Sequence, residues 1–584
     1  MSTNGNGLRS ASWFGGVSLY SFVHRSWMKA EGWAPDVFDG RPVVGICNSW
    51  SELVNCNVHF RALADAVKRG VWEAGGFPLE FPTLSLGEPF VKPSTMLYRN
   101  LMAMDVEEAI RSNPMDAVVL LCGCDKTTPA QLLGAASADL PAIMLPGGPM
   151  LKGRWKGEEI GSGTDAFRFA NAHRQGHITD EEFVAVEAGM HRSNGHCMVM
   201  GTASTMTSLA EALGMTLPGA ASIPAVDSRR YALAQATGRR AVELAREGLR
   251  PSSVLTQDAL ENAITALMAL GGSTNAVIHL TALAGRLPLE LPLERFDEIS
   301  GGTPVLADVK PSGAHLMEDF YYAGGVPALL RQIADLLHED ALTVTGRTLG
   351  EELAEVPEPY GPAVRQRSAP LSDVGGTVIL RGSLAPDGAV LKRSAASPHL
   401  LSHRGRALVF ASQFELLERI DDPDLDVDAD TVLVLHGAGP VGAPGMPEWG
   451  QMPIPRKLLD AGVTDMVRVS DARMSGTSYG TVVLHVAPES AVGGPLGLVR
   501  TGDEVELDVE TRRIDLLVED SELDRRRAAW QPPARAFERG YGRLFLDHVL
   551  QADEGCDFDF LRGGAADRLG ERDLAAQYAR IGHS

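Results

Sequence analysis

The stretch that decides the fold is residues 115–148, MDAVVLLCGCDKTTPAQLLGAASADLPAIMLPGG. The apolar run at 115–123 predicts a buried strand, and residues 141–146 predict a second strand that runs into two glycines. Between them a helix is expected from about Pro129 to Ala138. Short apolar strands that alternate with helices are typical of βαβ units, in which helices cover both faces of a parallel sheet.

The segments on either side continue this alternation and predict a large α/β/α domain with a parallel sheet over residues 1–365. A strand is expected at 42–47, and helices are expected at 59–74, 95–112, 203–213, most of 226–285 with a break at 270–274, and 326–338. In such sheets the chemistry lies in loops beyond the carboxyl ends of the strands, which is where CGCDK at 122–126 falls.

The composition changes near residue 355, where the Pro-rich segment VPEPYGPAVRQRSAP at 356–370 predicts a linker. Beyond it we expect a smaller β-rich, barrel-like domain over residues 366–584, with a C-terminal tail to which no element is assigned. Its strands and hairpins are expected at 376–392, 406–412, 430–439, 481–488 and 503–518.

Charge and apolar patterning narrow the class of protein. The chain has 584 residues and a net charge of -22, which disfavours a nucleic-acid partner because phosphate binding needs a basic face. Neither a signal peptide nor a membrane span is indicated, so a cytoplasmic location is expected. Six cysteines in such a chain do not form a disulfide framework, which leaves metal binding, catalysis or burial.

Three cysteines, Cys56, Cys124 and Cys197, lie in polar, glycine-containing turns rather than in apolar strands. Three thiolates from distant loops can hold iron or zinc and leave the metal an open position. The alternative is that each is a small buried hydrophobe, the common fate of a free cysteine. The other three cysteines fit that alternative better: Cys47, Cys122 and Cys556.

Four further positions have side chains that suit a divalent cation or its surroundings: Glu88, Asp125, Lys126 and Glu448. Converging carboxylates would suit Mg²⁺, whereas the plainer interpretation is a helix cap and solvated loop acids. Ser475 lies in the hydroxyl-rich turn SDARMSGTSYG at 470–480, and Ser273 and Thr274 lie in LGGSTNA at 270–276. The first turn is either a turn with local side-chain caps or a tight loop that presents Ser475 to a substrate. The second is either a helix break or an anion-binding turn made of backbone N–H groups.

Taken in order, GCDKTTPA, SNGHCMVMGTAS, LGGSTNAVIHL, GPVGAPGMPE and SDARMSGTSYG extend from residue 123 to residue 480. This ordered set resembles the dihydroxy-acid and phosphogluconate dehydratase family, and the similarity spans nearly the whole chain. The segments GEPFVKPSTMLYRNLMAMDVEEAI and GCDKTTPA are most similar to its sugar-acid branch.

The resemblance implies a role for each matching residue. The cysteines at 56, 124 and 197 would hold an iron–sulfur cluster, [2Fe–2S] in this branch, with [4Fe–4S] as the alternative. Glu88, Asp125 and Glu448 would bind Mg²⁺, and a carbamoylated Lys126 would be a further ligand. Ser475 would be the base, and Thr477 would contact the substrate, with Ser273 and Thr274 as further candidates. The site would lie between an α/β/α domain and a barrel-like domain, in a homodimer or homotetramer.

The function implied is a hydro-lyase that converts aldonates such as L-arabinonate, D-xylonate or D-gluconate to 2-keto-3-deoxy acids. The alternative is dehydration of 2,3-dihydroxyisovalerate in branched-chain amino-acid synthesis, alone or as a second activity. A thiol redox enzyme, a cluster-bearing sensor and a zinc-stabilised structural protein belong to other classes. The redox enzyme and the sensor would need a partner surface or a DNA-binding element, and neither is evident in the sequence.

Overall fold

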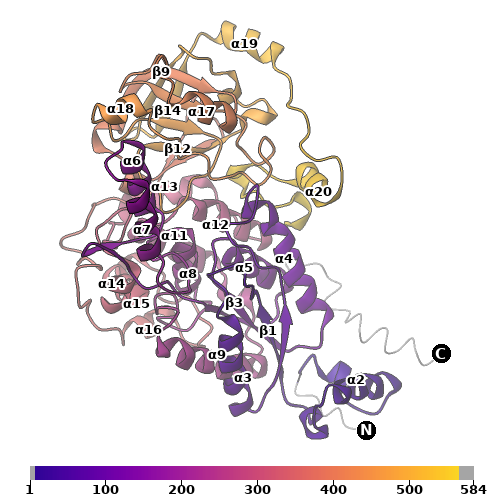
Figure 1. The fold of residues 1–584 in the computed structure, drawn as a ribbon. Coiled ribbons are helices and arrows are strands. Elements are labelled where there is room, and N and C mark those ends of the chain that lie inside the picture. Colours follow the sequence, from indigo (N-terminus) through magenta and orange to yellow (C-terminus); the bar gives the residue numbers. More distant parts are fainter. Residues whose placement is uncertain (1–6, 564–584) are drawn as a thin grey trace.

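The computed structural model describes residues 7–563 and arranges them as two packed bodies (Figure 1). The first, drawn from indigo to magenta, contains a parallel sheet surrounded by helices, and the second, in orange and yellow, is built around a larger sheet. The expected mixed α/β fold with a barrel-like second part is thereby confirmed. Residues 564–584 of the predicted C-terminal tail lie outside the described residues.

The first sheet has four parallel strands in the order β2-β1-β3-β4. Its strands are β1 (Val43–Asn48), β2 (Phe77–Pro82), β3 (Ala117–Cys122) and β4 (Ala142–Pro146). Helices α3 (Phe60–Glu73) and α9 (Ser228–Glu247) pack together on one face, and α4 (Thr95–Ser112) and α5 (Thr127–Ala138) pack together on the other. Strand β2 lies on one side of β1, and β3 and β4 lie on the other. With right-handed crossovers, this change of side places the connecting helices on opposite faces of the sheet.

The edge strand β2 was not predicted, because its sequence FPLEFP carries two prolines and alternates in burial. Proline removes a donor from the ladder, so it is tolerated only where one side of the strand is unpaired. The position of β2 at the edge of the sheet satisfies that requirement.

A further layer of helices packs beside the sheet. It contains the break between helices that was expected at 270–274. Helix α11 (Gln257–Leu270) ends at Gly271, whose φ of 54° gives the left-handed C-cap. Helix α12 (Asn275–Arg286) begins four residues later. The other helices of this layer are α8 (Thr202–Ala212), α10 (Pro251–Val254), α13 (Leu293–Gly302), α14 (Met317–Tyr322), α15 (Gly325–Gln332) and α16 (Leu349–Leu353).

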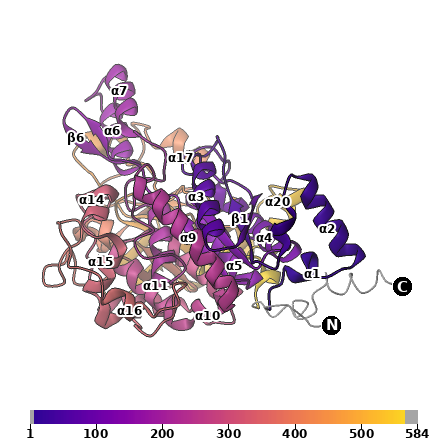
Figure 2. The same cartoon turned by 90° about the horizontal axis from the view of Figure 1, so that it is seen from below.

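A hairpin and two helices that were not predicted stand out from the first body, as Figure 2 shows. They are β5 (Gly153–Trp155), β6 (Glu158–Ile160), α6 (Thr164–Arg174) and α7 (Asp180–Met190). The end of α6 reaches the second body, where Arg174 pairs with Asp421 at 2.7 Å. Helices α1 (Ala11–Phe14) and α2 (Leu19–Ala30) lie at the opposite side of the molecule (Figure 2).

The second body is an eight-stranded sheet in the order β14-β13-β9-β10-β11-β12-β8-β7. The strands are β7 (Val378–Leu380), β8 (Gly388–Leu391), β9 (Ser402–Phe410), β10 (Val432–Leu435), β11 (Arg468–Ser470), β12 (Val482–Ala487), β13 (Glu504–Asp508) and β14 (Arg513–Leu517). A bridge between Arg381 and Arg513 joins its two edges, so the sheet is nearly closed into a barrel. Its helices are α17 (Gln413–Arg419), α18 (Arg456–Asp460), α19 (Asp520–Ala529) and α20 (Gly540–His548).

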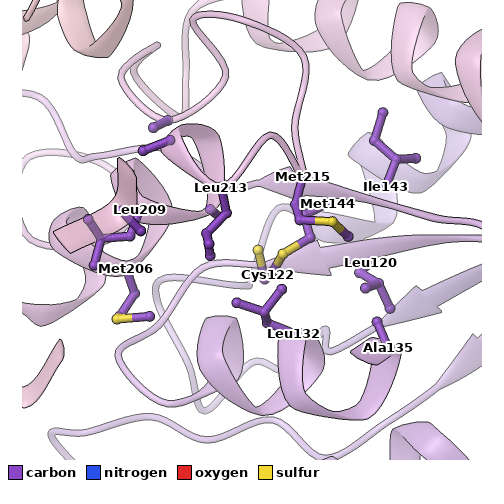
Figure 3. Packing of buried hydrophobic residues seen from close by; sticks show 14 of the residues in the cluster. Leu120, Cys122, Leu132, Ala135, Ile143, Met144, Met206, Leu209, Leu213 and Met215 are labelled. Carbon is purple, nitrogen blue, oxygen red and sulfur yellow. The ribbon is translucent and has the colours of Figure 1, made fainter. Parts of the chain in front are cut away.

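The sulfur-rich core beside β3 and β4 contains Cys122, which packs near Met144 and Leu132 (Figure 3). Its side chain is fully buried, as are those of Cys47 and, to within 2%, Cys556. The prediction that these three cysteines are buried is confirmed.

The connection between the bodies stays close to the first one. Bridges join Val364 to Ala307 and Ser372 to Val305. A domain division between residues 365 and 366 stays a prediction. No helix in the described part of the chain is long and apolar enough to cross a membrane.

Candidate active site

The loop between β3 and α5 places Cys124, Asp125 and Lys126 at the carboxyl end of the first sheet. The hydroxyl of Thr127 accepts the Cys124 N–H at 2.9 Å and donates to the Cys124 carbonyl at 3.0 Å, which fixes the turn. A methyl group at Gly123 would lie 2.6 Å from Asn57 Oδ1, so the glycine lets this loop approach the one that carries Cys56. The fold therefore brings two of the three candidate cysteine loops together.

The pKa values of Cys56 and Cys197 depend on the neighbouring candidate thiols. The pKa of Cys56 is raised well above its usual value by a hydrogen bond shared with the Cys124 thiol, by burial, and by the charges of Cys124 and Cys197. Burial, followed by the charge of Asp125, raises the pKa of Cys197 to about 12. Neutral thiols of this kind become thiolates when a metal replaces their protons. The set is therefore three sulfur donors in adjacent loops.

As the side chains stand, no group of three His, Cys, Asp or Glu residues among those described is spaced to hold a metal ion. The donor chemistry nevertheless fits the two groups that the sequence suggests. Sulfur ligands suit iron, and the neighbouring oxygen ligands suit Mg²⁺.

Three carboxylates surround the ammonium group of Lys126. Its Nζ lies 3.5 Å from Glu88 Oε2, 3.8 Å from Asp125 Oδ2 and 3.8 Å from Glu448 Oε1. The lysine is fully buried, and its Nζ has no hydrogen-bond partner in the described structure. Glu88 follows β2, Asp125 follows β3, and Glu448 comes from the second body, so both bodies contribute to one cluster.

Two acids of this cluster, Glu88 and Asp125, have a raised pKa. Burial raises the pKa of Glu88 to about 7, although the charge of Lys126 acts in the opposite direction. Burial also raises the pKa of Asp125, and the Glu448 charge adds to the effect. Carboxylates that repel one another in a buried site are stabilised by a divalent cation. The three acids around this buried Nζ therefore suit a divalent cation once the lysine has lost its positive charge.

Ser475 and Thr477 lie in a loop of the second body that is inserted against the first. Ser475 Oγ is 2.9 Å from Thr477 Oγ1, and the Thr477 N–H reaches Ser475 Oγ at 3.4 Å. Thr164, at the start of α6, donates to the Thr477 carbonyl at 2.7 Å. A methyl group at Gly476 would lie 2.6 Å from the Thr202 nitrogen, so only glycine permits this approach to α8.

The turn that contains Ser273 and Thr274 lies beside the Ser475 loop. Ser273 Oγ is 2.8 Å from Thr202 Oγ1, and a methyl group at Gly476 would touch the Ser273 side chain. Both residues are fully buried, and Thr274 Oγ1 has no partner within residues 7–563. Their contact with a substrate stays a prediction.

Arg473 and Asn275, which were not predicted as site residues, connect Glu448 of the acid cluster to the loop that contains Ser475. Arg473, with no exposed side-chain surface, donates to Glu448 Oε1 at 2.9 Å, to Asn275 Oδ1 at 3.0 Å and to Ser94 Oγ at 2.9 Å. Asn275 in turn donates to Glu448 Oε1 at 3.2 Å and to the Met474 carbonyl at 3.1 Å. Arg473 lies inside the motif SDARMSGTSYG and Asn275 inside LGGSTNA. Their position among the small residues of these motifs is the feature of the sequence that could have identified them as site residues.

Comparisons with known proteins show which family this chain resembles along its length. Residues 41–352 match the family described as "Dihydroxy-acid/6-phosphogluconate dehydratase N-terminal", and residues 362–556 match its C-terminal counterpart. The L-arabonate dehydratase of Azospirillum brasilense is 56% identical over 95% of this chain and 97% of its own length. The L-arabinonate dehydratase of Rhizobium leguminosarum bv. trifolii is 53% identical over 97% and 98%. The dihydroxy-acid dehydratase of Ignicoccus hospitalis is 41% identical over 91% and 97%.

Proposed function

The chain belongs to the dihydroxy-acid/6-phosphogluconate dehydratase family, and on that premise we propose that it dehydrates sugar acids. The substrates would be 2,3-dihydroxy aldonates such as L-arabinonate, D-xylonate or D-gluconate, and the products 2-keto-3-deoxy acids. Relatives named for arabinonate share 53–56% of their residues with this chain, against 41% for the dihydroxy-acid dehydratase, which favours the sugar-acid branch.

The observation that supports the proposal most directly is the convergence of Glu88, Asp125 and Glu448 on the buried Nζ of Lys126. An ammonium group surrounded by acids but hydrogen-bonded to none of them is an unsatisfactory structural contact. Carbamoylation would turn this lysine into an anion, and the four anionic groups would then bind Mg²⁺ through oxygen.

In the same proposal Cys56, Cys124 and Cys197 hold an iron–sulfur cluster, [2Fe–2S] or, as the alternative, [4Fe–4S]. When bound, the cluster and Mg²⁺ supply Lewis acidity toward the hydroxyl and carboxylate oxygens of the substrate. The charge of Asp125 acts on both Cys56 and Cys197, which supports a common site for the two groups.

The protein's own groups carry the proton transfer. Ser475 Oγ, as an alkoxide, would take the proton from C2 of the substrate. The hydroxyl at C3 would leave as hydroxide and take that proton from Ser475 to become water, and the enol that remains would tautomerise to the 2-keto acid. A serine is a weak base, so its negative charge needs nearby donors, and Thr477 offers a hydroxyl at 2.9 Å and its N–H. Arg473 and Asn275 hold Glu448 in place.

The proposal is tested by turnover of aldonates with anaerobically purified protein that retains its iron and Mg²⁺. We expect keto-acid formation from at least one of L-arabinonate, D-xylonate and D-gluconate, faster than from 2,3-dihydroxyisovalerate. A preference for the branched acid would move the protein to the alternative function. A colourless protein that contains only zinc would remove the iron–sulfur assignment.

The role of Ser475 has its own test. Ser475→Ala should abolish turnover and leave the visible absorbance and the iron content unchanged, because the serine is not a proposed ligand. Turnover that survives the substitution would show that another group takes the C2 proton.

The remaining parts of the proposal concern the setting of the enzyme. We place it in the cytoplasm as a homodimer or homotetramer that binds a small sugar acid. Its mass in solution, measured by light scattering, would decide between the oligomers.

A further inference from the structure

Lys392 is a buried lysine that no part of the proposed mechanism uses. It directly follows β8, and its side chain is only 1% exposed. Its Nζ donates a hydrogen bond to the Gly476 carbonyl at 3.3 Å. It forms no ion pair with any residue in the described range 7–563, so this carbonyl is the polar contact that the structure gives its ammonium group.

An unpaired buried ammonium group is unusual, because burial without a counter-charge costs free energy. Burial lowers the pKa of Lys392 to about 7, and no neighbouring charge contributes to that shift. Two other buried cations pair with acids, Arg286 with Asp557 at 2.6 Å and Arg468 with Asp465 at 2.6 Å. Arg99 and Arg230 are buried without an ion pair among the described residues, but each donates to at least two carbonyls, whereas Lys392 donates to one. A group that weakens the fold and is nevertheless present calls for a role in function.

The hydrogen bond of Lys392 continues to Ser475 through one peptide group. The carbonyl that accepts from Lys392 belongs to the peptide between Gly476 and Thr477, and the N–H of that same peptide points to Ser475 Oγ at 3.4 Å. In its protonated form Lys392 places a positive charge at the carbonyl oxygen, which polarises the peptide and makes its N–H a stronger donor, since hydrogen bonds in series reinforce one another. The charge of Lys392 therefore favours negative charge on Ser475 Oγ through the peptide between them.

We infer that Lys392 is a positioning residue for Ser475, which fixes the Gly476–Thr477 peptide and strengthens its N–H donor to the serine oxygen. This inference rests on the proposed function in one respect, the role of Ser475 as the base. It assigns Lys392 no contact with the substrate or with either metal group.

The test compares three substitutions of Lys392 in the holoenzyme. Lys392→Met removes the charge and the donor, Lys392→Gln keeps a neutral donor, and Lys392→Arg keeps the charge. For Lys392→Met we expect kcat to fall by roughly 10- to 100-fold, because removing a direct oxyanion donor lowers kcat by about 10²–10³ and this donor acts indirectly. KM should change by less than about threefold, and visible absorbance should not change.

Stability separates this role from a structural one. Because Lys392→Met removes a buried unpaired charge, its melting temperature should equal or exceed that of the wild type. Lys392→Arg should recover part of kcat, and the kcat of Lys392→Gln should lie between those of the Met and Arg variants.

A matched control is Lys152→Met, which breaks ion pairs to Glu159 at 2.9 Å and Asp319 at 2.8 Å and should leave kcat unchanged. A common loss of kcat and melting temperature in all three Lys392 variants would overturn the inference.

A further measurement separates its failure from that of the proposed function. If the wild type converts no dihydroxy acid, the proposed function fails, and a crystal structure of Lys392→Met still decides the inference. We expect the Thr477 N to Ser475 Oγ distance to lengthen, and an unmoved loop would overturn the inference.

Discussion

The sequence predicts that Lys126 belongs to a functional site, whereas the role of Arg473 becomes visible only from its neighbours in the structure. Lys126 follows a cysteine and an aspartate at the end of a predicted strand, so its place near a site could be predicted. Arg473 could not be found in this way, because an arginine in a loop is exposed in most proteins. Its burial depends on Ser94, Asn275 and Glu448, three partners that the fold brings from distant parts of the chain.

The first prediction concerns Arg473. Arg473→Lys keeps the charge but cannot reach Glu448, Asn275 and Ser94 together, because a single ammonium lacks the fork of donors. We expect kcat/KM and the affinity for Mg²⁺ to fall by about 10- to 100-fold, the usual effect of losing a group that orients a ligand. Mg²⁺ titration of turnover measures both. An unchanged Mg²⁺ dependence would show that Glu448 needs no such support.

A second prediction concerns Glu489, a buried acid whose carboxylate accepts the N–H groups of Val441 at 3.0 Å and Gly442 at 2.9 Å. Burial, followed by the Asp471 charge, raises its pKa to about 7. Since the folded pKa lies above the unfolded one, near 4.5, its stabilising contribution is complete below pH 4.5 and is lost as pH rises through 7.

Glu489→Gln should remove that part of the pH dependence. The shift corresponds to about 3 kcal/mol, so the wild type should lose more stability than the variant between pH 5 and pH 8 by an amount of that order. Thermal or urea unfolding at the two pH values measures the difference. Parallel pH profiles for the two proteins would contradict the prediction.

At the scale of elements, regular apolar segments were predictable and short or edge elements were not. The helix expected at 95–112 is α4, and the strand expected at 115–123 contains β3, because burial on all sides leaves a continuous apolar run. Strand β11 has three residues and its first, Arg468, is charged, so no periodicity marks it. The unit from β5 to α7 was missed because it packs on its own small cluster around Phe169.

The third prediction tests how α6 meets the Ser475 loop. Gly163 has a φ of 68°, and a methyl group there would collide with Thr477 Oγ1. Gly163→Ala should therefore displace Thr477 and lower kcat by at least about 10-fold, the size of effect that a displacement near 1 Å can produce. Gly157→Ala is a matched control, since its φ is 87° but nothing lies within 4 Å. Both variants should lose about 1–2 kcal/mol to backbone strain, and only the first should lose activity.

At the scale of the whole molecule, the site depends on how the two bodies meet. The sequence predicts each body, but it cannot give the distance between them, because that depends on contacts such as Thr164 with Thr477. The C-terminal part of the described chain returns to the first body, where Arg286 binds Asp557 with both partners buried. Arg99 also donates to the Gly555 and Cys556 carbonyls at 3.0 and 2.9 Å.

The fourth prediction concerns that returning segment. Asp557→Ala removes the carboxylate that accepts two hydrogen bonds from Arg286 and leaves the guanidinium only one acid among the described residues, Glu107 at 3.6 Å. Breaking a buried pair typically costs about 3–5 kcal/mol, so the free energy of unfolding should fall by about 3 kcal/mol, the lower end of that range. Replacing the exposed partner of a surface pair, as in Asp524→Ala beside Arg527, should change it by less than about 1 kcal/mol. Urea unfolding compares them, and equal effects would mean that the buried pair does not fasten the segment.

The split origin of the acid cluster also sets an order of events during synthesis. Glu88, Asp125 and Lys126 are synthesised early, whereas Glu448 and Ser475 are synthesised late, because they lie far along the chain. At about 5–20 residues per second, translation from Cys197 to Ser475 takes roughly 15–55 s. During that interval the nascent chain carries Cys56, Cys124 and Cys197 but lacks Glu448 and Ser475. Under the proposed function, a cluster that formed on these thiols before release would therefore form beside an incomplete acid cluster.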